Sequence, residues 1–322
     1  MNPDQKKIDI IVINWNSGEM LLSLMTSIND LNDKMYIGKF IVVDNNSSDD
    51  SLSLVTNSEW DFNVEVLKNN TNSGFARACN FGASVGSSEY ILFLNPDTIV
   101  YEDALSAPLK FMASPENHEY AACGIQLVDE KNIPNRCCAR IPDFSNFINS
   151  GLGLDMLAPN QFKGILHREW THQESRDVGH VIGAFYFVRR KIFEQFKGFD
   201  PRYFLYYEDL DLSTNITKAG YKVAYLSQPK AIHIGGGCSE KIKAKRLSYS
   251  YLSKVLYILK HFPFTKALPL VALVFIVEPI QRFSFYIIRL SFKEALLSLT
   301  GYLLFLWSIL SLPFSQRNYV QH

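Results

Sequence analysis

Two acidic spots in the sequence have residue types and positions that could support catalysis. Asp97 follows the apolar run EYILFL, and further carboxylates lie in YYEDLDL at residues 206–212. A carboxylate at the end of an apolar strand costs stability unless an ion or a hydrogen bond offsets that cost. A divalent cation with phosphate oxygens would do so, because Mg²⁺ uses one or two carboxylates together with phosphates. Asp97 is therefore a candidate metal ligand.

The acidic group at 206–212 begins a predicted helix, and it has two interpretations. Carboxylates in the first turn of a helix interact favourably with the helix dipole, which is a purely structural role. Alternatively, one of them is directed into a cleft and acts as a general base that removes a proton from a substrate. These residues alone do not choose between Glu208, Asp209 and Asp211 for that role.

Polar side chains end three of the predicted strands. The sequences are NWN at 14–16, DNN at 44–46 and NPD at 95–97. Taken singly, such residues are typical caps of the helix that follows. In open parallel sheets, however, ligands bind beyond the carboxyl ends of the strands. Three strand ends with the same chemistry favour a polar-ligand site at that edge.

The elements that would position these residues alternate between strand and helix, which predicts an α/β fold with a mainly parallel sheet. The expected strands cover residues 8–14, 39–44, 64–67, 89–94, 120–128, 178–188 and 221–226. The expected helices cover residues 18–31, 74–85, 102–112, 190–196 and 208–219. A turn at 129–132 predicts a hairpin into a strand at 133–141. Residues 143–175 show no period and are expected to form a long loop that recognises substrate.

The composition is typical of a folded protein in a reducing compartment. The 322 residues are 47% hydrophobic and 20% charged, so the chain can bury a large core. Its 32 basic and 32 acidic residues give no net charge, which argues against general nucleic-acid binding. Five cysteines, two of them adjacent, form neither a disulfide framework nor a CxxC pair for zinc. The first residues, MNPDQKKIDI, lack the apolar stretch of a signal peptide, so we expect a cytoplasmic start.

Three common nucleotide or hydrolase motifs are missing from the sequence. No GxGxxG follows the first strand, no GxxxxGK[ST] is present, and no GxSxG occurs. The first absence disfavours a dinucleotide-binding domain, the second a P-loop kinase or ATPase, and the third an α/β-hydrolase.

Seven segments in a fixed order resemble the family-2 glycosyltransferases of the GT-A fold, close to the rhamnosyltransferase-like branch. They are IVINWNS (11–17), IVVDNNSSDDS (41–51), NTNSGFARACNFG (70–82), YILFLNPDT (90–98), GAFYFVRR (183–190), GFDPRYFLYYEDLDL (198–212) and AIHIGGGCS (231–239). The resemblance implies an inverting transfer of a sugar, best guess rhamnose from a dTDP-sugar, to a hydroxyl of a glycan or lipid-linked glycan. The product would belong to cell-surface polysaccharide synthesis.

The same resemblance assigns roles to individual residues at the donor site. Asp44 would hydrogen-bond the pyrimidine base of the donor, and the loop at 72–77 would follow the nucleotide and its diphosphate. The implied donor-binding residues are Asn14, Asn16, Asp44, Asn72, Gly74, Arg77 and Asn80.

The resemblance also implies a metal site and a catalytic base. Asp97 corresponds to the last aspartate of the family's DxD motif, whose first position is Asn95 here. His233 would complete the site for a divalent cation, Mg²⁺ or Mn²⁺, or for the diphosphate. Asp209 would be the base, with Glu208 beside it as the other catalytic carboxylate.

Two other functions compete with this one. A nucleotidyltransferase that makes a sugar nucleotide would use a related fold, but residues 14–20 lack the basic glycine-rich loop that such enzymes prefer. A protein that binds a nucleotide sugar without catalysis is the second alternative. The presence of Asp97, Asp209 and His233 argues against it.

The C-terminal region, residues 247–322, is expected to be an apolar helical part that follows a catalytic domain at 1–246. Residues 295–314 carry no charge and are long enough for a bilayer core of about 30 Å, although Ser, Thr, Gly and Pro weaken that span. Residues 269–293 mix charges with Phe and Ile, which suits an interfacial amphipathic helix. A basic cluster at 241–246 would face anionic headgroups or the donor diphosphate.

We therefore expect attachment to the cytoplasmic face of the cell membrane, with a polyprenyl-diphosphate-linked glycan as the acceptor. The alternative is that these helices simply pack against the catalytic domain.

Overall fold

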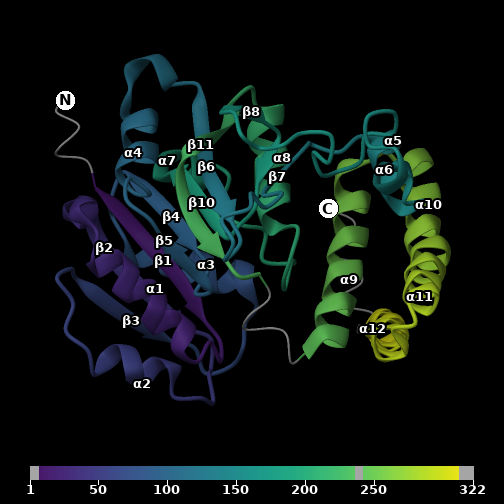
Figure 1. The fold of residues 1–322 in the computed structure, drawn as a ribbon, viewed down its shortest axis with the longest axis horizontal. Helices are drawn as coiled ribbons and strands as arrows, with labels where there is room; N and C mark the ends of the chain where they lie inside the picture. The colour runs from purple at the N-terminus through teal and green to yellow at the C-terminus, as the bar shows by residue number, and fades with distance from the viewer. Residues whose placement is uncertain (1–6, 236–241, 312–322) are drawn as a thin grey trace. The chain divides into compact units, whose positions relative to one another are not determined.

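The computed structural model describes residues 7–235 and 242–311, and the chain divides into two compact units (Figure 1). Unit 1 consists of Met1–Ile141, Trp170–Arg202 and Glu208–Cys238, and unit 2 consists of Pro142–Glu169, Tyr203–Tyr207 and Ser239–His322. The boundary expected after residue 246 falls inside helix α9, Lys243–His261, which belongs wholly to unit 2.

The described part of unit 1 is built on a nine-stranded sheet, and the predicted α/β fold is confirmed. Its strands are β1 Ile8–Asn14, β2 Ile37–Asp44, β3 Val64–Lys68, β4 Tyr90–Leu94, β5 Thr98–Val100, β6 Tyr120–Val128, β8 Arg176–Val178, β10 Phe185–Arg189 and β11 Lys222–His233. The order is β3-β2-β1-β4-β10-β6-β11-β5, with β8 beside β11. Strands β1 to β4 are parallel, as are β6 and β11, whereas β10 runs antiparallel between β4 and β6.

Helices cover this sheet because its central strands are apolar on both faces. Every residue of β1 and β4 is buried, as expected for strands covered from both sides. The helices of unit 1 are α1 Glu19–Asn29, η2 Asn32–Tyr36, α2 Ser51–Thr56, α3 Phe75–Val85, α4 Ser106–Ala113, η3 Pro115–Asn117, α7 Arg190–Gln195 and α8 Glu208–Lys218. Helix α3 packs on β1 and β2. A Cβ at Gly82 would lie 2.6 Å from Ile11, so this close packing requires glycine.

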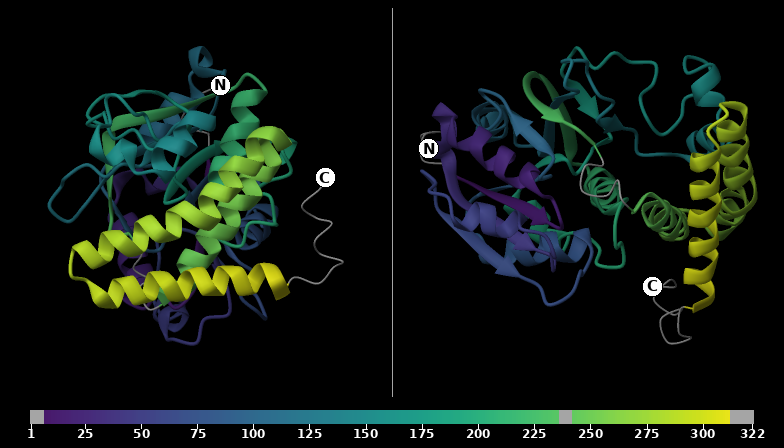
Figure 2. Two further views of the ribbon diagram at one scale, coloured as in Figure 1. Left: turned by 90° about the vertical axis from the view of Figure 1, so that its right-hand side faces the viewer. Right: turned by 60° about the horizontal axis from the view of Figure 1, so that its bottom comes forward.

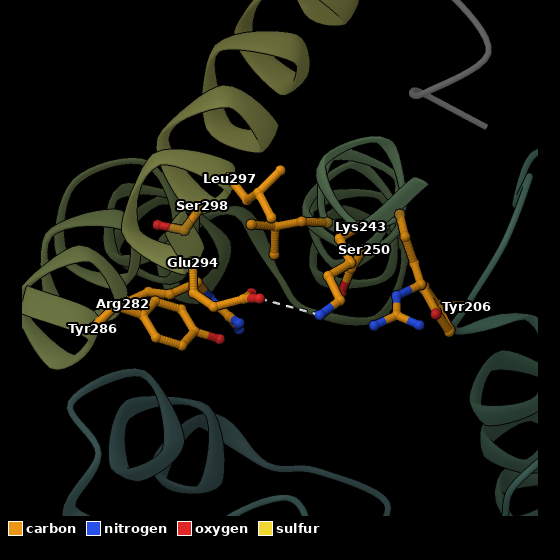
Figure 3. A pocket seen from close by; sticks show the side chains of 10 residues that line it. Tyr206, Lys243, Ser250, Arg282, Tyr286, Glu294, Leu297 and Ser298 are labelled. Atoms are coloured by element: carbon orange, nitrogen blue, oxygen red, sulfur yellow. Dashed lines mark hydrogen bonds and ion pairs between the residues drawn. The ribbon is translucent and has the colours of Figure 1, made fainter. Parts of the chain in front are cut away.

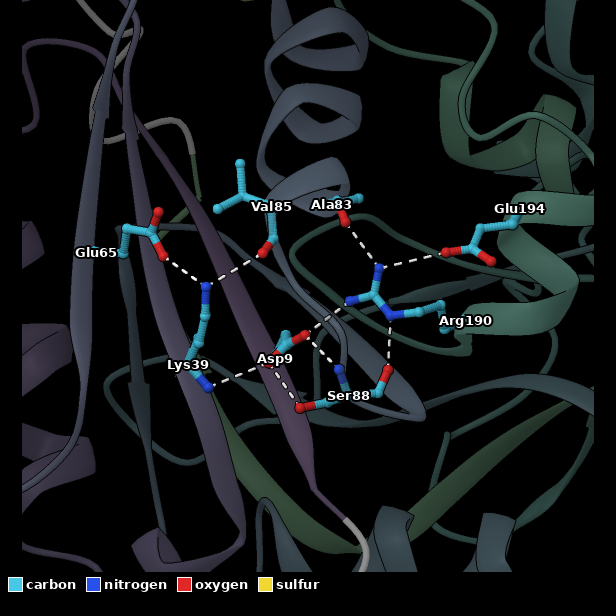
Figure 4. Close-up of polar contacts among 8 residues, drawn as sticks. All are labelled: Asp9, Lys39, Glu65, Ala83, Val85, Ser88, Arg190 and Glu194. Carbon is cyan, nitrogen blue, oxygen red and sulfur yellow. Dashed lines mark hydrogen bonds and ion pairs between the residues drawn. The ribbon is translucent and has the colours of Figure 1, made fainter.

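A buried ion pair ties the start of β1 to α7 (Figure 4). Arg190 donates from Nη2 to Asp9 Oδ2 at 2.8 Å and from its other nitrogens to the carbonyls of Ala83 and Ser88. The Asp9 carboxylate, 1% exposed, also accepts from the Ser88 N–H and hydroxyl and from the Lys39 N–H. The charges are therefore paired and hydrogen-bonded, the condition under which buried charges are tolerated.

The structure corrects two predicted strands. The expected strand at 178–188 is broken into β8, the short β9 His180–Val181, and β10. At the first break the backbone passes so close to Ile141 that a Cβ at Gly179 would lie 2.2 Å from the Ile141 nitrogen, so this position requires glycine. The predicted turn at 129–132 does return the chain antiparallel to the end of β6, with Val128 bridged to Pro134 and the Asn135 N–H donating to the Leu127 carbonyl at 2.8 Å. The strand expected at 133–141 is nevertheless reduced to β7 Cys138–Ala139, which pairs with β9.

Strand β11 is much longer than the predicted 221–226 and reaches His233. Its pairing with β6 shifts register between Leu226 and Lys230 and then resumes. Pro229 lies within this shift. In the sequence it indicates the end of a strand, because proline lacks the N–H that donates hydrogen bonds within a sheet. The bulge allows the strand to continue, and so it carries His233 to the edge where β5 pairs with it.

Residues 143–175 are not a plain loop, which corrects another expectation. Unit 2 contains α5 Phe144–Gly151 and α6 Leu154–Leu157 in this region. Asp143 accepts from the Asn146 N–H at 2.8 Å, and Asn146 accepts from the Asp143 N–H at 3.1 Å, a reciprocal cap that starts α5. The helices span eight and four residues, too short for the sequence to show a helical period.

Unit 2 contains further helices. They are α9 Lys243–His261, α10 Phe264–Ala272, a π-helical segment Leu273–Val277, α11 Glu278–Ile288 and α12 Phe292–Ser311. Of these, α10 to α12 carry many exposed apolar side chains. Helix α12 packs along both α9 and α11 (Figure 2). Phe264–Ile288 and Phe292–Ser311 are long and apolar enough to cross a membrane by length and composition, and only 17% and 22% of their most apolar stretches are buried. Residues 312–314 of the predicted span lie outside the described residues.

The cysteines of the described chain are buried and free. Cys79, Cys123, Cys137 and Cys138 all carry thiols, whereas Cys238 lies outside the described residues. The adjacent Cys137 and Cys138 are not joined to each other, which agrees with the absence of a disulfide framework in the sequence.

Candidate functional site

The predicted pair Asn14 and Asp44 meets at the carboxyl ends of β1 and β2, where the two residues are register partners. Asn14 Nδ2 donates to Asp44 Oδ1 at 2.9 Å and to Ser51 Oγ at 2.9 Å. Asn14 is fully buried and Asp44 is 6% exposed. The amide of Asn14 therefore fixes the orientation of the Asp44 carboxylate from within the protein.

Asn16 joins the loops that follow β1 and β2. Its Oδ1 accepts from the Ser48 N–H at 2.7 Å, and its own N–H donates to Ser47 Oγ at 3.0 Å. Its φ of 50° places it in the left-handed region, which asparagine tolerates better than most residues. These bonds give the strand-end loops a defined shape beside Asp44.

Asn45 organises the next loop, and the sequence analysis did not single it out. Its Nδ2 donates to Asn72 Oδ1 at 2.9 Å, and its Oδ1 accepts from the Ser73 N–H at 3.0 Å. Asn72 Oδ1 in turn accepts from the Gly74 N–H at 3.0 Å. Asn45 is 2% exposed, so this network is structural. The sequence signal that could have identified Asn45 was its position directly after Asp44 at the end of a strand.

The loop at 72–74 leads into α3, and two of the predicted donor residues, Gly74 and Arg77, lie at the start of this helix. Gly74 precedes the helix with φ of 83°, a conformation that side chains disfavour. Arg77 lies in the first turn and is exposed. Backbone N–H groups and a guanidinium at a helix N-terminus suit an anionic ligand.

Asn80 is held elsewhere on α3. Its Nδ2 donates to the Phe199 carbonyl at 2.7 Å, and its Oδ1 accepts from the Phe199 N–H at 2.9 Å. Both ends of the amide are thus engaged with one backbone unit. Asn80 therefore joins α3 to the turn at 198–200, and its amide positions these two segments.

Asp97 and His233 lie together at the same edge of the sheet. His233 Nε2 is 3.5 Å from Asp97 Oδ1, and the pairing of β5 with β11 places His233 opposite Thr98. His233 Nε2 is buried without a hydrogen-bond partner. A nitrogen lone pair and a carboxylate facing one point are suitable ligands for a divalent cation.

This pair fits a cation that takes its remaining ligands from a substrate. Among residues 7–235 and 242–311, no group of three His, Cys, Asp or Glu side chains could hold a metal ion. Mg²⁺ commonly binds through one or two carboxylates together with substrate phosphates, so two protein ligands are compatible with it.

The Asp209 carboxylate is fixed by backbone N–H groups. Its Oδ2 accepts from the Gly183 N–H at 2.6 Å, and its Oδ1 accepts from the Leu210 N–H at 2.8 Å. The Gly183 N–H is available because strand character stops at 182–184, where β9 and β10 are separated. The side chain is 14% exposed, enough to meet a proton donor from solvent or substrate.

His180 approaches the same carboxylate and was missed by sequence reasoning. His180 Nε2 lies 3.6 Å from Asp209 Oδ1, with the histidine side chain 6% exposed. Burial lowers the pKa of His180, and the negative charge of Asp209 acts against that effect. No motif in the sequence marks this histidine, because only the pairing of β9 with β7 brings it beside α8.

Glu208 is a different kind of acid from its neighbour. It is 4% exposed, and its Oε2 has no hydrogen-bond partner. Burial raises the pKa of Glu208 well above its usual range, and the charges of Asp209 and Asp211 raise it further. Of the two adjacent acids, Asp209 is therefore the one that is hydrogen-bonded at both oxygens and partly accessible.

A backbone hydrogen bond links the metal-binding edge to the acid site. The Asn95 N–H donates to the Ala184 carbonyl at 3.1 Å, next to Gly183, whose N–H holds Asp209. The arrangement as a whole combines a buried acceptor at Asp44, an anion-binding helix start, a cation-binding pair and a fixed carboxylate. It can bind a nucleotide diphosphate and remove a proton from a nucleophile.

Comparison with known proteins identifies similar chains. The family model described as "Glycosyl transferase family 2" matches residues 9–197, more than half of the chain. The chain is 32% identical to the rhamnosyltransferase WbbL of Escherichia coli K12 over 145 residues, 45% of this chain and 52% of that protein. The matched segment thus spans about half the length of this relative.

Two further rhamnosyltransferases match over longer segments. The N-acetylglucosaminyl-diphospho-decaprenol L-rhamnosyltransferase of Mycobacterium tuberculosis is 25% identical, over 61% of this chain and 67% of that protein. The O-antigen chain rhamnosyltransferase RfbN of Salmonella typhimurium is 24% identical, over 70% of this chain and 66% of that protein.

Solved structures agree on the fold. The mannosyltransferase PcManGT of Pyrobaculum calidifontis, in complex with GDP-Man and Mn²⁺, has a TM-score of 0.55 at 14% identity, over 99% of this chain and 84% of that one. S. aureus TarS 1–349 has a TM-score of 0.53 at 15% identity, over 83% of this chain and 70% of that one. These similarities support the GT-A fold that the sequence predicted.

Proposed function

Because the chain belongs to glycosyl transferase family 2, we propose that it is an inverting transferase that moves a sugar from a nucleotide-diphosphate donor to a hydroxyl group. The similar rhamnosyltransferases support rhamnose, carried by dTDP, as the sugar. The acceptor is a glycan or lipid-linked glycan of cell-surface polysaccharide synthesis. The observation that carries the proposal is the partly exposed Asp209 carboxylate, fixed by the Gly183 and Leu210 N–H groups.

Asp209 acts as the general base in this reaction. It takes the proton from the acceptor hydroxyl as that oxygen forms a bond to the anomeric carbon of the donor sugar. The bond from this carbon to the diphosphate oxygen breaks, and its electron pair leaves with the nucleoside diphosphate. Attack from the face opposite the leaving group inverts the configuration.

The donor lies along the carboxyl ends of the strands. Asp44, oriented by Asn14, hydrogen-bonds the base, and Asn16 shapes the same pocket. Gly74 and Arg77 at the start of α3 receive the diphosphate, where N–H groups and positive charge favour it. Asp97 and His233 would hold the divalent cation, which neutralises negative charge on the diphosphate when bound.

Unit 2 attaches the enzyme to the cytoplasmic face of the cell membrane. The support is the exposed apolar surface of α10 to α12, together with the lipid named in the M. tuberculosis relative. A membrane-bound enzyme of this kind would meet a polyprenyl-diphosphate-linked acceptor at the surface where that lipid resides.

A screen of sugar nucleotides against the full chain, with Mn²⁺ or Mg²⁺, tests the proposal through release of nucleoside diphosphate. We expect dTDP-rhamnose to be preferred over UDP-hexoses. The Asp209→Asn variant should lower kcat at least about 100-fold, the usual contribution of a general base, while donor affinity changes little.

The Gly183 and Leu210 N–H groups donate to different oxygens of Asp209, and in asparagine one of these oxygens becomes an NH2 group, so one of the two N–H groups faces a donor. Thermal unfolding of the variant therefore serves as the control for local distortion. Undiminished transfer in a folded Asp209→Asn protein would contradict the role of Asp209. No release from any sugar nucleotide by the wild-type protein would contradict the transferase itself.

A further inference from the structure

Two segments of unit 2 have the length and composition of membrane spans, Phe264–Ile288 and Phe292–Ser311, and both contact helix α9 near their middle. In the second segment, which is α12, Gly301 is the tenth of 20 residues. A Cβ at Gly301 would lie 2.8 Å from the Ala244 carbonyl oxygen and 3.0 Å from Leu247 Cβ. The middle of α12 therefore packs directly on the start of α9.

The start of α9 is highly charged, which disfavours a position at the centre of a bilayer. Lys243, Lys245 and Arg246 lie in its first turn, and Lys245 is exposed. If α12 crossed the bilayer, Gly301 would lie near the centre of the hydrocarbon core, and these charges would lie close to it. Charged side chains at that depth are strongly disfavoured.

The same helices line a polar cavity (Figure 3). It has a volume of about 370 Å³ and lies between α9, α11 and α12. Lys243 and Arg246 line it from α9, Arg282 lines it from α11, and Glu294 lines it from α12, where Glu294 Oε1 accepts from Lys243 Nζ at 3.1 Å. A polar cavity of this size is large enough for water. This side of the helices is therefore suited to water rather than to hydrocarbon.

The other candidate span is joined to α9 by an ion pair. Glu278 lies two residues beyond the middle of Phe264–Ile288, and its carboxylate oxygens accept from Lys254 Nζ of α9 at 2.7 and 2.9 Å. The pairing makes burial of these charges within the protein tolerable. A bilayer crossing by this segment, however, would bring the ion pair and part of α9 into the hydrocarbon core.

The exposed apolar residues of α12 lie on one face, as in a helix that lies flat on a membrane. Its large exposed apolar side chains are Phe292, Leu296, Leu299, Leu303, Trp307 and Leu310. Steps of three and four residues place them on one side of the helix. The buried residues Ala295, Ser298, Gly301 and Phe305 lie on the opposite side. On α11, the exposed Ile280, Phe283 and Ile287 have the same spacing.

Helices α10, α11 and α12 form one layer beside α9. Helix α12 contacts both α9 and α11, and Figures 1 and 2 show α10 to α12 on the same side of α9. The apolar faces of two helices in one layer can enter a single leaflet together. An interfacial helix typically inserts by about 5–10 Å, which does not require a crossing.

The charge of this region is complementary to an anionic lipid surface. Residues 243–311 contain nine Lys and Arg and two Glu, a formal net charge of +7, whereas the whole chain has no net charge. Lys245 and Lys293 are exposed on α9 and α12. Basic residues beside an apolar face interact favourably with anionic headgroups.

We propose that α10, α11 and α12 lie in the plane of one anionic leaflet and that neither candidate span crosses the bilayer. Their apolar faces enter the acyl region, and Lys245 and Lys293 lie at the level of the headgroups. The inference rests on the proposed function for the attachment to a membrane, and it adds how the chain is attached. Both ends of α12 then stay on the same side of the bilayer as unit 1.

Thiol labelling in sealed membrane vesicles of both orientations tests this topology. Ser291→Cys and Ser311→Cys mark the two ends of α12, and Asn57→Cys marks an exposed position of unit 1. Each full-length variant is treated with a membrane-impermeant maleimide, and the labelling is divided by that obtained in detergent. The unsubstituted chain gives the background from its own cysteines. We expect all three sites to react from the same side only.

Labelling from the opposite side would overturn the proposal. If only Ser311→Cys reacts there, α12 crosses the bilayer; if only Ser291→Cys does, the two segments cross as a hairpin. Reaction of both sites from the opposite side would mean that Phe264–Ile288 crosses alone. Thermal unfolding of each variant, compared with the unsubstituted chain, identifies any that is misfolded.

Flotation with vesicles tests the charge of the bound surface. The full chain should bind phosphatidylglycerol vesicles more tightly than phosphatidylcholine vesicles. Lys245→Gln/Lys293→Gln should weaken binding to phosphatidylglycerol at least about 10-fold, since each basic residue near an anionic surface contributes to the attraction. Lys110→Gln/Lys131→Gln is the matched control, because it removes two exposed charges from unit 1, and it should change binding less than about twofold.

Equal weakening by the two double variants would contradict the position of the basic residues at the headgroups. If the unsubstituted chain binds neither kind of vesicle, the apolar faces are covered by protein, and the membrane attachment in the proposed function fails as well. Sugar transfer is judged separately by the Asp209→Asn variant, which should bind vesicles normally. The in-plane topology can therefore fail while attachment and transfer both hold.

Discussion

Asp209 and Glu208 are neighbours in the chain, but their carboxyl groups lie in different environments. Asp209 accepts two backbone N–H bonds and is partly exposed, whereas Glu208 is buried with one oxygen that has no partner. Hydrogen bonds to an ionised carboxylate stabilise it, and burial destabilises it. Environment thus separates the two acids: the proposed base is hydrogen-bonded and partly accessible, whereas burial raises the pKa of Glu208.

The raised pKa of Glu208 predicts a dependence of stability on pH. The folded protein holds the Glu208 proton more tightly than the unfolded chain, where the pKa is about 4.5. The stability that this group contributes is therefore complete at low pH and is lost as the pH rises through 4.5 towards the folded value. Glu208→Gln, which mimics the neutral acid, should therefore be more stable than wild type at pH 7, in the direction set by the raised pKa of Glu208.

Urea unfolding of both proteins between pH 4 and pH 8 measures this effect. The difference in free energy of unfolding should be small at pH 4 and should grow in favour of the variant as the pH rises. A constant difference across that range would show that Glu208 does not carry the shifted titration.

At the scale of elements, the ends of β4 and β11 form the proposed cation-binding edge. Asp97→Ala should weaken both metal and donor binding, and the deficit should shrink as the metal concentration rises. His233→Ala should do the same to a smaller degree, because a neutral ligand contributes less charge than a carboxylate. Calorimetry of nucleoside diphosphate binding over a series of Mn²⁺ concentrations measures both.

Asp61→Asn is a suitable control for that experiment. Asp61 is an exposed carboxylate of unit 1, paired with Lys34 at 2.7 Å, and its loss removes a negative charge away from the strand ends. Metal-dependent donor binding that is the same in the Asp97 variant and this control would contradict the assignment of the cation to β4.

Helices α10 to α12 form the second element-scale feature, and their exposed apolar faces predict membrane attachment. Leu296→Glu together with Leu303→Glu should move the protein from membranes to the soluble fraction. Each exposed leucine contributes about 1.5–3 kcal/mol when buried in an apolar environment, so the partition coefficient should fall at least about 100-fold. Ser53→Glu with Thr56→Glu adds the same charges to α2 and should have no such effect.

Flotation with vesicles measures this partitioning. If the wild-type protein stays at the bottom of the gradient with every lipid composition, the apolar faces are covered by protein instead.

The stability of unit 1 as a whole depends on the buried pair of Asp9 and Arg190, which joins segments far apart in the chain. Removal of one partner leaves an uncompensated buried charge, at a typical cost of about 3–5 kcal/mol. Asp9→Asn should therefore lower the free energy of unfolding by an amount in that range. Glu194→Gln removes an exposed partner 3.6 Å from Arg190 and should cost below about 1 kcal/mol.

Urea denaturation of the two variants measures the difference. Specific activity of the folded Asp9→Asn protein should remain near wild type, since the pair lies at the opposite ends of the strands from Asp44. A loss of less than 1 kcal/mol in Asp9→Asn would mean that neighbouring N–H groups alone support this region.

The sequence by itself determined the α/β fold, most strands of unit 1 and the polar residues that follow them. A strand buried on both faces is apolar throughout, and polar residues directly after it mark the ligand edge; both signals are local. Asp44 and Asp97 stood out for that reason, whereas only the family resemblance singled out Asp209 within its acidic group. The sequence did not predict the short helices at 143–157, because eight and four residues are too few to show a helical period of apolar residues.

Only the tertiary structure decided the contacts between distant segments. His180 meets Asp209 because Gly179 lets the backbone pass close to Ile141, and His233 reaches Asp97 because β11 continues through a bulge. Contacts between distant segments also create the distinct environments of Glu208 and Asp209. They likewise place the three cations that line the unit 2 cavity. Burial and electrostatic fields depend on every segment packed around a group, and a local pattern in the sequence does not record them.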